Sequence, residues 1–474
     1  MSISTPPVFA PRPPGRVLPT LNEDGSRRWL RPKWVDGTYA VRRRAVAWGL
    51  MALWIVLPHL TVGGKQAVLL DFPRRHFTIL GTTFLPTDTI LLMLLLISGL
   101  IGIFLLTALF GRAWCGWACP QTVWMEFLFR PIERLWEGGE RGSLKLDADA
   151  AHWHWRRLGK TATYAVIAVL LGNTFLSYFV GTSTLAQWMT LSPLEHPTPF
   201  VIMAIFSGAT FFDFAYFREQ TCLVACPYGR WQSALLDRQS LIVAYDPARG
   251  EPRGKGKSRD GLGSCVDCGQ CVAVCPTGID IRNGLQMECI HCTQCLDACN
   301  DVMDRTHQPR GLIRYTSRDA LDGKARRLIR PRTVLYPAAF SLFFGGFLFA
   351  LGTKATADVT LLGATGAPYT IEQDGSVVNQ MRIKIANRGD ATRRFRIALP
   401  DVPEARLVAP VNPLVVEAGR FEMTSTFVVL PPTAFTAGVR TVTFSIDDGE
   451  GYRESFTYRL AGPRSSSAPA PVAP

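Results

Sequence analysis

The chain has 474 residues, of which 47% are hydrophobic, an ordinary share for a soluble protein. Its apolar residues are gathered into uncharged runs, and several reach the roughly 18–20 residues that span a bilayer, which excludes a purely soluble protein. The net charge of +13 comes with no basic-aromatic motif, so it indicates membrane orientation rather than nucleic-acid binding.

Five apolar runs predict membrane-spanning helices, and they are residues 45–62, 89–110, 162–186, 199–217 and 334–352. Lys and Arg number nine before the first span, three in the first loop, eight in the second and none in the third. Because basic residues stay on the cytoplasmic side, this alternation predicts a multi-pass membrane protein with its N-terminus in the cytoplasm and its C-terminal domain outside, which is the periplasm if the membrane is the inner membrane of a Gram-negative bacterium. Residues 1–44 and the tail 463–474 are predicted to be disordered.

One motif occurs twice in the predicted four-helix membrane core, residues 45–245. Phe110–Trp124 and Phe217–Trp231 both read Phe-x4-Cys-x2-Ala-Cys-Pro-x3-Trp, offset by 107 residues. Because each copy follows two spans, we expect two related hairpins about a pseudo-two-fold axis, with four thiols together at the cytoplasmic end of the bundle. These predicted catalytic and metal-binding residues are Cys115, Cys119, Cys222 and Cys226.

Four thiolates suit soft metals, which here means an iron–sulfur cluster, mononuclear iron, zinc or copper(I). Two redox-active dithiols without a metal, or buried structural cysteines, are the alternatives. After the first pair, apolar residues recur at helical spacing from Trp124 to Trp136, with Arg130, Glu133 and Glu137 among the polar residues of the other face. This pattern predicts an amphipathic helix that lies on the cytoplasmic interface and anchors the loop.

The other eight cysteines form two Cys-x2-Cys-x2-Cys-x3-Cys runs in a predicted ferredoxin domain, residues 264–332, after a linker at 246–263. In bacterial ferredoxins with this spacing, the fourth cysteine of each run ligates the other cluster. We therefore predict two [4Fe-4S] clusters. The first uses Cys265, Cys268, Cys271 and Cys299; the second uses Cys289, Cys292, Cys295 and Cys275. Asn300 replaces the usual proline, which predicts a looser turn after Cys299.

Residues 333–353 contain the fifth predicted membrane helix, and residues 359–462 alternate apolar and polar side chains. Examples of the alternating apolar residues are Met381, Ile383 and Ile385, then Phe395 and Ile397. Short strands over about 100 residues favour an immunoglobulin-like β-sandwich, which we interpret as an interaction module. The expected fold is thus a multidomain membrane protein, with a bundle of about five transmembrane helices, an inserted two-cluster ferredoxin-like domain and a C-terminal sandwich.

In this combination the chain resembles the FixG/CcoG/RdxA family, accessory proteins for assembly of the cbb-type cytochrome c oxidase. Besides the cysteine motifs and the sandwich, the resemblance rests on three segments: Tyr245–Gly254, Gly278–Arg282 and Leu70–Pro73. It implies an oxidoreductase that reduces copper(II) to copper(I) for the copper centre of the oxidase. Implied partners are oxidase subunits or assembly factors, a copper exporter or chaperone, membrane lipid and an unidentified electron donor, while homo-oligomerisation stays open.

Copper reduction is predicted at the four membrane-proximal thiols, because soft thiolates suit copper(I) better than the few candidates on the outer side. Those candidates are His59, His76, Met189 and His196. Two other functions compete with this one. The first is a quinol-oxidising electron-transfer subunit like the NapH-type membrane ferredoxins, although these resemble the chain only in its core. The second is a non-enzymatic assembly scaffold that carries clusters.

Overall fold

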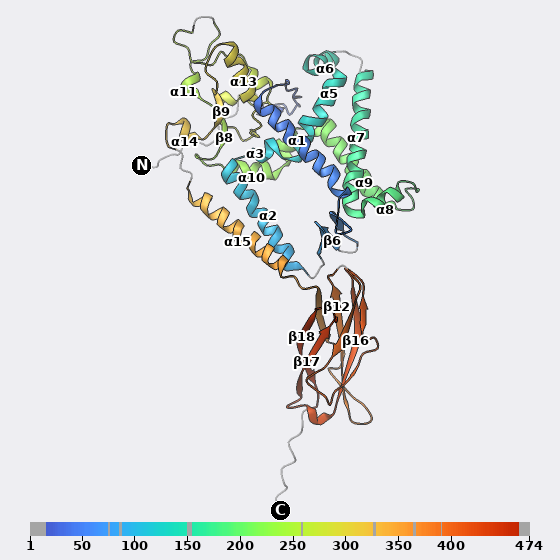
Figure 1. The fold of residues 1–474 in the computed structure, drawn as a ribbon. Helices are drawn as coiled ribbons and strands as arrows, with labels where there is room; N and C mark the ends of the chain where they lie inside the picture. The colour runs from blue at the N-terminus through green and yellow to red at the C-terminus, as the bar shows by residue number, and fades with distance from the viewer. Residues whose placement is uncertain are drawn as a thin grey trace, which may run out of the picture. The chain divides into compact units, whose positions relative to one another are not determined.

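The computed structural model describes residues 16–463 apart from seven short gaps, and the chain divides into two compact units (Figure 1). The gaps are residues 74–75, 85–87, 149–153, 257–258, 326–328, 364–365 and 390. The first unit comprises residues 1–70 and 92–347 and holds all the cysteines, and the second comprises residues 71–91 and 348–474. The predicted disorder of residues 1–15 and 464–474 falls outside the described residues.

Four helices of the described chain are long and apolar enough to cross a membrane. They are α2 (Thr89–Phe110), α7 (Trp155–Val180), α9 (Pro197–Phe212) with the π-helical turn Asp213–Phe217 that extends it, and α15 (Pro331–Gly352). They correspond to the second to fifth predicted spans. Long uncharged runs identify such helices without further information, because the bilayer thickness sets their length.

The first predicted span differs from the structure. Helix α1 covers Thr38–Val56, so it begins earlier than predicted and includes three consecutive arginines, Arg42, Arg43 and Arg44. The predicted span extends to residue 62, but the chain after α1 forms the 3-10 turn Leu57–His59 and strand β3 (Thr61–Val62) instead. The arginines explain why α1 is not among the four helices above. Four more strands lie between β3 and α2: β4 (Lys65–Gln66), β5 (Val68–Asp71), β6 (His76–Ile79) and β7 (Thr82–Phe84).

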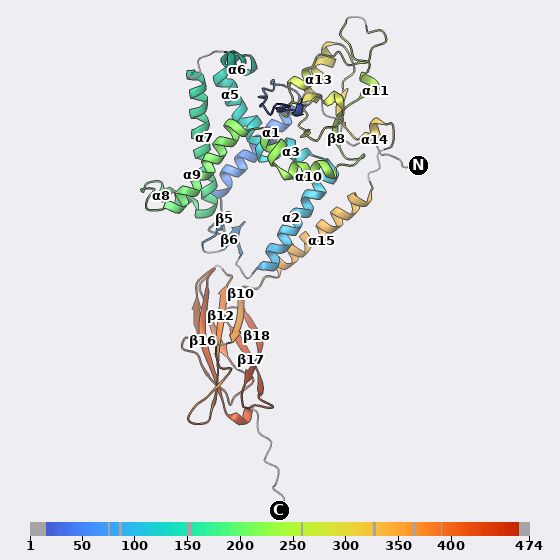
Figure 2. The ribbon, with the colours of Figure 1, turned by 180° about the vertical axis from the view of Figure 1, so that it is seen from behind.

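The long helices do not form two equivalent pairs. Helix α7 packs along α9, where the rings of Phe175 and Phe206 stack with centroids 3.9 Å apart. Helix α2 lies beside α15 in both views (Figure 2), and the ring centroids of Phe104 and Tyr336 are 6.1 Å apart. The repeated motif predicts instead that α2 pairs with the first span. The first copy of the motif therefore follows α2, and the helix beside α2 is α15, which comes from the carboxyl-terminal end of the unit.

Each copy of the repeated motif forms short helical segments. The first contains α3 (Ala113–Trp117), α4 (Pro120–Trp124) and a π-helical turn (Met125–Phe129), and α5 (Arg130–Glu137) and α6 (Gly139–Ala148) follow. The second contains the π-helical turn Thr221–Ala225 and α10 (Pro227–Leu235). Pro120 and Pro227 each begin a helix after an extended cysteine, because proline fixes its own φ and restricts the residue before it.

The ferredoxin region is closed by a strand pair that the sequence did not reveal. Strand β8 (Ile242–Tyr245) pairs antiparallel with β9 (Ile313–Thr316), so the region begins before residue 264. The predicted linker 246–263 packs on this region: the Asp246 N–H donates to the Leu312 carbonyl at 3.0 Å, and the Gly254 N–H donates to the Cys265 carbonyl at 3.3 Å. The short helices of the region are α11 (Pro247–Gly250), α12 (Gln270–Ala273), the 3-10 turn Ile281–Asn283, α13 (Gln294–Arg305) and α14 (Arg318–Leu321).

Helix α13 corrects one detail of the sequence interpretation. Cys299 and Asn300 both lie inside this helix, so there is no turn after Cys299 for Asn300 to loosen. The Asn300 side chain instead accepts a hydrogen bond from the Gly311 N–H at 3.0 Å. It thereby ties α13 to the segment that leads into β9.

Residues 16–44 are ordered, although their composition predicted disorder. They contain the strand pair β1 (Arg16–Leu18) and β2 (Leu21–Asn22), and the Lys33 N–H donates to the Ala273 carbonyl at 2.9 Å. At the start of α1, the Asp297 carboxylate of α13 accepts the Ala40 N–H at 2.7 Å, which stabilises the first turn of the helix. These partners lie in the ferredoxin region, so the composition of the segment alone could not reveal them.

The second unit contains the predicted β-sandwich, whose two sheets are antiparallel. One sheet has the order β10 (Ala357–Gly363), β12 (Val377–Asn387), β16 (Phe421–Leu430) and β14 (Arg406–Val408), with β11 (Thr370–Ile371) also on β12. The other has the order β15 (Leu414–Val416), β13 (Arg393–Ala398), β17 (Val439–Asp447) and β18 (Arg453–Ala461). The alternating residues Met381, Ile383, Ile385, Phe395 and Ile397 lie in the shared core, which confirms the prediction.

Candidate functional site

The eight ferredoxin cysteines surround two separate cavities. Those assigned to the first cluster, Cys265, Cys268, Cys271 and Cys299, all line one cavity. Those assigned to the second, Cys275, Cys289, Cys292 and Cys295, all line the other, together with apolar side chains such as Ile279 and Ile281. Cys271 lines both cavities. Each set of four thiols thus lines one cavity with an apolar shell that suits an iron–sulfur cluster, and the assignment of ligands to clusters stays a prediction.

The backbone beside the second cysteine of each run is left-handed. Asp267 and Gly269 flank Cys268 with φ of 50° and 69°, and His291 and Thr293 flank Cys292 with φ of 55° and 63°. Three of these four residues carry a side chain, for which this conformation is unfavourable. Strained backbone persists where the surrounding structure determines it, as at ligand-binding loops. The left-handed conformation recurs in both cysteine loops and bends each loop around its cavity.

His291 offers a polar group to the second cavity. Its Nδ1 accepts a hydrogen bond from the Arg112 N–H at 3.2 Å, so the ring proton lies on Nε2. Burial lowers the pKa of His291 to about 3, as does the charge of Arg112, and the ring is therefore neutral. Nε2 is buried, has no hydrogen-bond partner among the described residues, and belongs to a residue that lines the cavity. A cluster sulfur there would accept this N–H.

The four thiols of the repeated motif come together from two distant segments. Burial raises the pKa of Cys222, and negative charge on Cys119, Cys115 and Cys226 raises it further. Burial likewise raises the pKa of Cys115, whereas Arg112 opposes this effect. The two segments are in contact, because the Cys115 thiol of the first lies 3.0 Å from the Gln232 side-chain oxygen of the second. A bound soft metal would relieve the cost of burial by taking the thiols as thiolates.

No three His, Cys, Asp or Glu side chains within the described ranges are grouped closely enough to hold a single metal ion. A cubane cluster needs no such grouping, because each thiolate ligates a different iron. The spacing between the thiols, which is wider than a single metal ion needs, therefore suits the two clusters of the ferredoxin region. At the four thiols of the repeated motif, this spacing lets a single ion, whether zinc or copper(I), contact no more than two thiolates, which is fewer than the four ligands of a structural zinc ion.

Gln232 is a residue of the site that the sequence interpretation missed. The Cys115 thiol donates to the Gln232 side-chain oxygen at 3.0 Å. The Gln232 amide donates in turn to the Thr107 hydroxyl at 3.0 Å and to the Tyr228 hydroxyl at 3.4 Å. Gln232 follows the shared Trp231, whereas methionine stands at the equivalent position of the first copy, Met125. The sequence signal that could have revealed Gln232 is this difference, because the polar residue occurs in only one of the two copies.

The second ferredoxin cavity lies directly beside the first copy of the motif. A Cβ on Gly116 would lie 2.5 Å from the Ile290 carbonyl oxygen and 2.9 Å from the Cys292 nitrogen. Cys115 packs with Ile290 and Cys292 in one buried cluster. Cys268, in the first group of ligands, is exposed instead. The thiols therefore form a series that runs from the four-thiol group through the second ferredoxin group to the first.

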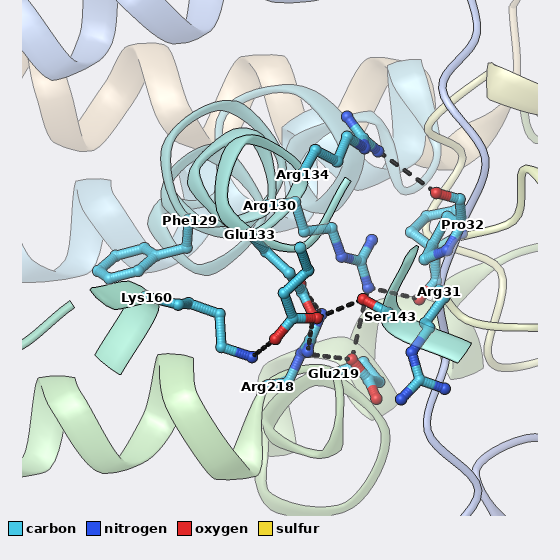
Figure 3. A network of polar contacts seen from close by, with 12 residues as sticks. Arg31, Pro32, Phe129, Arg130, Glu133, Arg134, Ser143, Lys160, Arg218 and Glu219 are labelled. Carbon is cyan, nitrogen blue, oxygen red and sulfur yellow. Dashed lines mark hydrogen bonds and ion pairs between the residues drawn. The ribbon is translucent and has the colours of Figure 1, made fainter. Parts of the chain in front are cut away.

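A buried network of ion pairs joins the same parts of the unit (Figure 3). Arg130 is 3% exposed and pairs with Glu126 and with Glu219, the latter at 3.4 Å. It also donates to the carbonyl of Pro276, which follows a ligand of the second group, at 3.4 Å. The network therefore fixes the ferredoxin loops against helix α5 and the second copy of the motif.

Arg218 extends the network by pairing with both oxygens of Glu133, at 2.9 and 3.1 Å. Burial opposes ionisation of Glu133, but Arg218 outweighs burial and holds the pKa of Glu133 below its usual value. This contact buries the polar face of α5 against the 218–219 loop, whereas Leu135 is 82% exposed. The partners of these charges lie far away in sequence, so the amphipathic pattern could not reveal them. The position of α5 on the membrane interface stays a prediction.

Comparison with known sequence families agrees with this site. A family described as "4Fe-4S binding domain" matches residues 92–138, one described as "4Fe-4S dicluster domain" matches 217–318, and one described as "IG-like fold at C-terminal of FixG" matches 347–463. Together with the apolar helices and the cysteine groups, these matches define a membrane-associated iron–sulfur electron-transfer protein with a C-terminal immunoglobulin-like domain.

Curated relatives narrow this class to a family. Protein RdxA of Cereibacter sphaeroides is 35% identical over 413 residues, which cover 83% of each chain. Nitrogen fixation protein FixG of Rhizobium meliloti is 32% identical over 432 residues, covering 80% of this chain and 81% of the relative. The chain belongs to the FixG/RdxA family. A crystal structure of a FixG-related protein from Vibrio parahaemolyticus matches 23% of this chain and 98% of its own at 13% identity and a TM-score of 0.21.

Proposed function

We propose that the protein is a copper(II) reductase in cbb-type cytochrome c oxidase biogenesis, and that it delivers electrons from its two ferredoxin clusters to copper at Cys115, Cys119, Cys222 and Cys226. The observation that carries the proposal is the direct contact of Gly116 with Ile290 and Cys292. This contact brings a cluster-binding loop against the four-thiol group without intervening structure. The link to the oxidase rests on the family resemblance.

The thiols supply the chemical reason for reduction at this site. Copper(II) takes one electron to become copper(I), and soft thiolates favour copper(I) over copper(II). Binding there therefore makes the ion easier to reduce. In the topology that the charge pattern favours, these thiols face the cytoplasm, and copper(I) leaves to an exporter or chaperone on that side. The sandwich then lies in the periplasm, where it meets oxidase subunits or assembly factors.

One observation favours a second identity for the four-thiol group. The "4Fe-4S binding domain" match at 92–138 contains only Cys115 and Cys119, half of the ligands of one cubane. Cys222 and Cys226 are the only cysteines of the chain outside this match and the eight-cysteine run. A third iron–sulfur cluster at this group would pass electrons to copper rather than bind it.

The experiment replaces all four cysteines with serine and compares copper(II) reduction with the wild type. Iron analysis and EPR must show that about eight irons in two ferredoxin clusters remain. We expect reduction to fall to the background rate. Undiminished reduction would rule out the four-thiol site, and quinol oxidation without copper reduction, or neither activity, would favour one of the two competing functions. Loss of about four further irons in the variant would identify a third cluster.

A further inference from the structure

A cavity of about 660 Å³ lies between the membrane-spanning helices α2 and α15. Its wall includes Ser98, Gly99 and Gly102 of α2 and Phe340 of α15. A volume of this size with a mostly apolar wall and a few polar groups is typical of a small-molecule site. Neither the ferredoxin clusters nor the copper site uses this space.

The cavity opens on the exposed, apolar surface of two helices that are long enough to span the membrane. Only 11% of the apolar window of α2 and 6% of that of α15 are buried, so both helices present most of their surface to the bilayer. Leu106 and Trp114 line the cavity and are 41% and 40% exposed. An occupant would therefore have to be soluble in the membrane.

One end of the cavity leads to the four-thiol group. Tyr228 lines the cavity, and its hydroxyl accepts a hydrogen bond from the Gln232 amide at 3.4 Å. The other end of that amide, the Gln232 oxygen, accepts the Cys115 thiol at 3.0 Å. Trp114, on the same wall, directly precedes Cys115. Two side chains, Tyr228 on the wall and Gln232 behind it, thus link the cavity to a thiol of the redox site.

We propose that this cavity binds a lipid-soluble quinol, which is the electron donor of the protein. An acyl chain has no polar group to offer the Tyr228 hydroxyl, which can form a further hydrogen bond besides the one it accepts from Gln232, whereas a quinol presents a flat ring to Trp114 and Phe340 and a hydroxyl to Tyr228. The proposal rests on the proposed function for its electron acceptor, but the binding of quinone does not.

The reaction balances with copper as acceptor. The quinol breaks two O–H bonds, loses two electrons and becomes the quinone, two copper(II) ions become copper(I), and two protons pass to water at the membrane surface. Because the quinol gives two electrons and each copper takes one, the second electron needs a temporary carrier. The ferredoxin clusters, next to the four-thiol group, each hold one electron.

The test fills the cavity without disturbing the fold. Gly99 lines the cavity and is exposed, and a Cβ added to it would have no atom within 4 Å, so Gly99→Leu adds a side chain to open space. Leucine is also the better helix former. Gly208 of α9 is likewise exposed with no atom within 4 Å of an added Cβ, but it does not line the cavity, so Gly208→Leu is the matched control.

Full-length protein in quinone-free nanodiscs is titrated with decylubiquinone. Copper(II) reduction is measured with decylubiquinol, and separately with protein whose clusters have been reduced by dithionite and freed of the excess reagent, because dithionite itself reduces copper(II). We expect Gly99→Leu to weaken quinone binding at least tenfold and to slow the quinol reaction, with dithionite-driven reduction unchanged and Gly208→Leu like the wild type. Non-saturable binding, or equal binding by both variants, would overturn the proposal and leave phospholipid as the occupant. Saturable quinone binding without any copper reduction would instead refute the proposed function alone.

Discussion

The backbone of Gly116 lies directly against the backbone of Cys292. A Cβ on Gly116 would be 2.9 Å from both the nitrogen and the Cα of Cys292, and 2.5 Å from the preceding Ile290 carbonyl. These are backbone atoms, which cannot rotate out of the way as a side chain can. The close approach requires glycine at this position, and it joins the two halves of the proposed electron path.

Gly116→Ala is expected to separate the two loops. The methyl group forces a backbone shift, which should cost about 1–3 kcal/mol of stability, as other overpacking substitutions do. Electron transfer from the second cluster to the four-thiol group should slow as well. Chemical unfolding and stopped-flow oxidation of the reduced clusters by copper(II) would measure the two effects. Gly346→Ala, where nothing lies within 4 Å of the added carbon, is the control, and equal behaviour of the two variants would contradict the prediction.

The two ferredoxin clusters should be separable by single substitutions. Cys268 lines only the first cavity and Cys292 only the second. We therefore expect Cys268→Ser and Cys292→Ser each to remove one cluster, or about four irons, and to leave the other cluster in place. Iron analysis and EPR of anaerobically purified protein would show this. Two clusters in both variants would refute the assignment of ligands.

His291→Leu should lower the reduction potential of the second cluster. The substitution removes the buried Nε2 proton, which has no other partner among the described residues. Hydrogen bonds to cluster sulfur stabilise the more negative, reduced state, so their loss makes reduction harder. A redox titration followed by EPR would resolve the two clusters. The first cluster serves as the internal control, and an unchanged second potential would show that His291 does not donate to the cluster.

Arg130→Met should destabilise the first unit strongly. It leaves Glu126 buried without its ion-pair partner, while Glu219 keeps only its longer pairs with Arg27 and Arg218, at 3.6 and 3.7 Å. Breaking a buried pair in this way typically costs ~3–5 kcal/mol. The control is Arg305→Met, because Arg305 forms an exposed pair with Asp301 in which both side chains are more than half accessible, and such pairs contribute roughly 0.2–1 kcal/mol. Thermal unfolding followed by tryptophan fluorescence should therefore show a large decrease only for Arg130→Met. Similar midpoints for the two variants would argue against the network.

The sandwich should lose stability in acid through Asp448. Burial opposes its ionisation, but the N–H groups of Glu450 and Tyr452 and the Arg393 guanidinium outweigh burial and hold its pKa below the usual value. The stabilisation is therefore complete above the ordinary carboxyl pKa of about 4 and is lost as the pH falls through the lower value of the folded state.

Calorimetry of the full-length protein would test this. Asp448→Asn should lower one transition at neutral pH, by an amount that corresponds to about 1–3 kcal/mol for the unsatisfied partners. The difference between the variant and the wild type should shrink below pH of about 4, because the wild-type carboxylate becomes protonated there. A difference that stays constant with pH would contradict the assignment.

The parts of this fold that could be predicted are those in which the sequence carries a local pattern that repeats at a fixed spacing. The alternation at Met381, Ile383 and Ile385 fixes which face of a strand is buried, and the fixed cysteine spacing sorts eight thiols into two groups. The membrane spans without charges were recognised for the same reason. The start of α1 at Thr38 was missed because its cap, Asp297, comes from a helix far along the chain.

The burial of the polar face of α5 was missed on similar grounds. An amphipathic pattern shows that a helix has two faces, but it does not show which face another segment covers. Here Arg218 and Glu219 supply buried charges that match those of α5, so the charged side turns inward. Gln232 was missed because a single amide has no periodicity, and only its difference from Met125 in the other copy distinguishes it.

The capping of α1 by Asp297 has a consequence for how the protein is made. Helix α13, which carries Asp297, also carries Cys295 and Cys299, and these two thiols belong to different clusters. The first turn of α1 is synthesised long before α13. Its capping residue, Asp297, is therefore in position only after α13 has folded around both clusters. Iron supply thereby becomes a folding condition for the amino-terminal helix, and a chain starved of iron would expose its early segments to proteases during biogenesis.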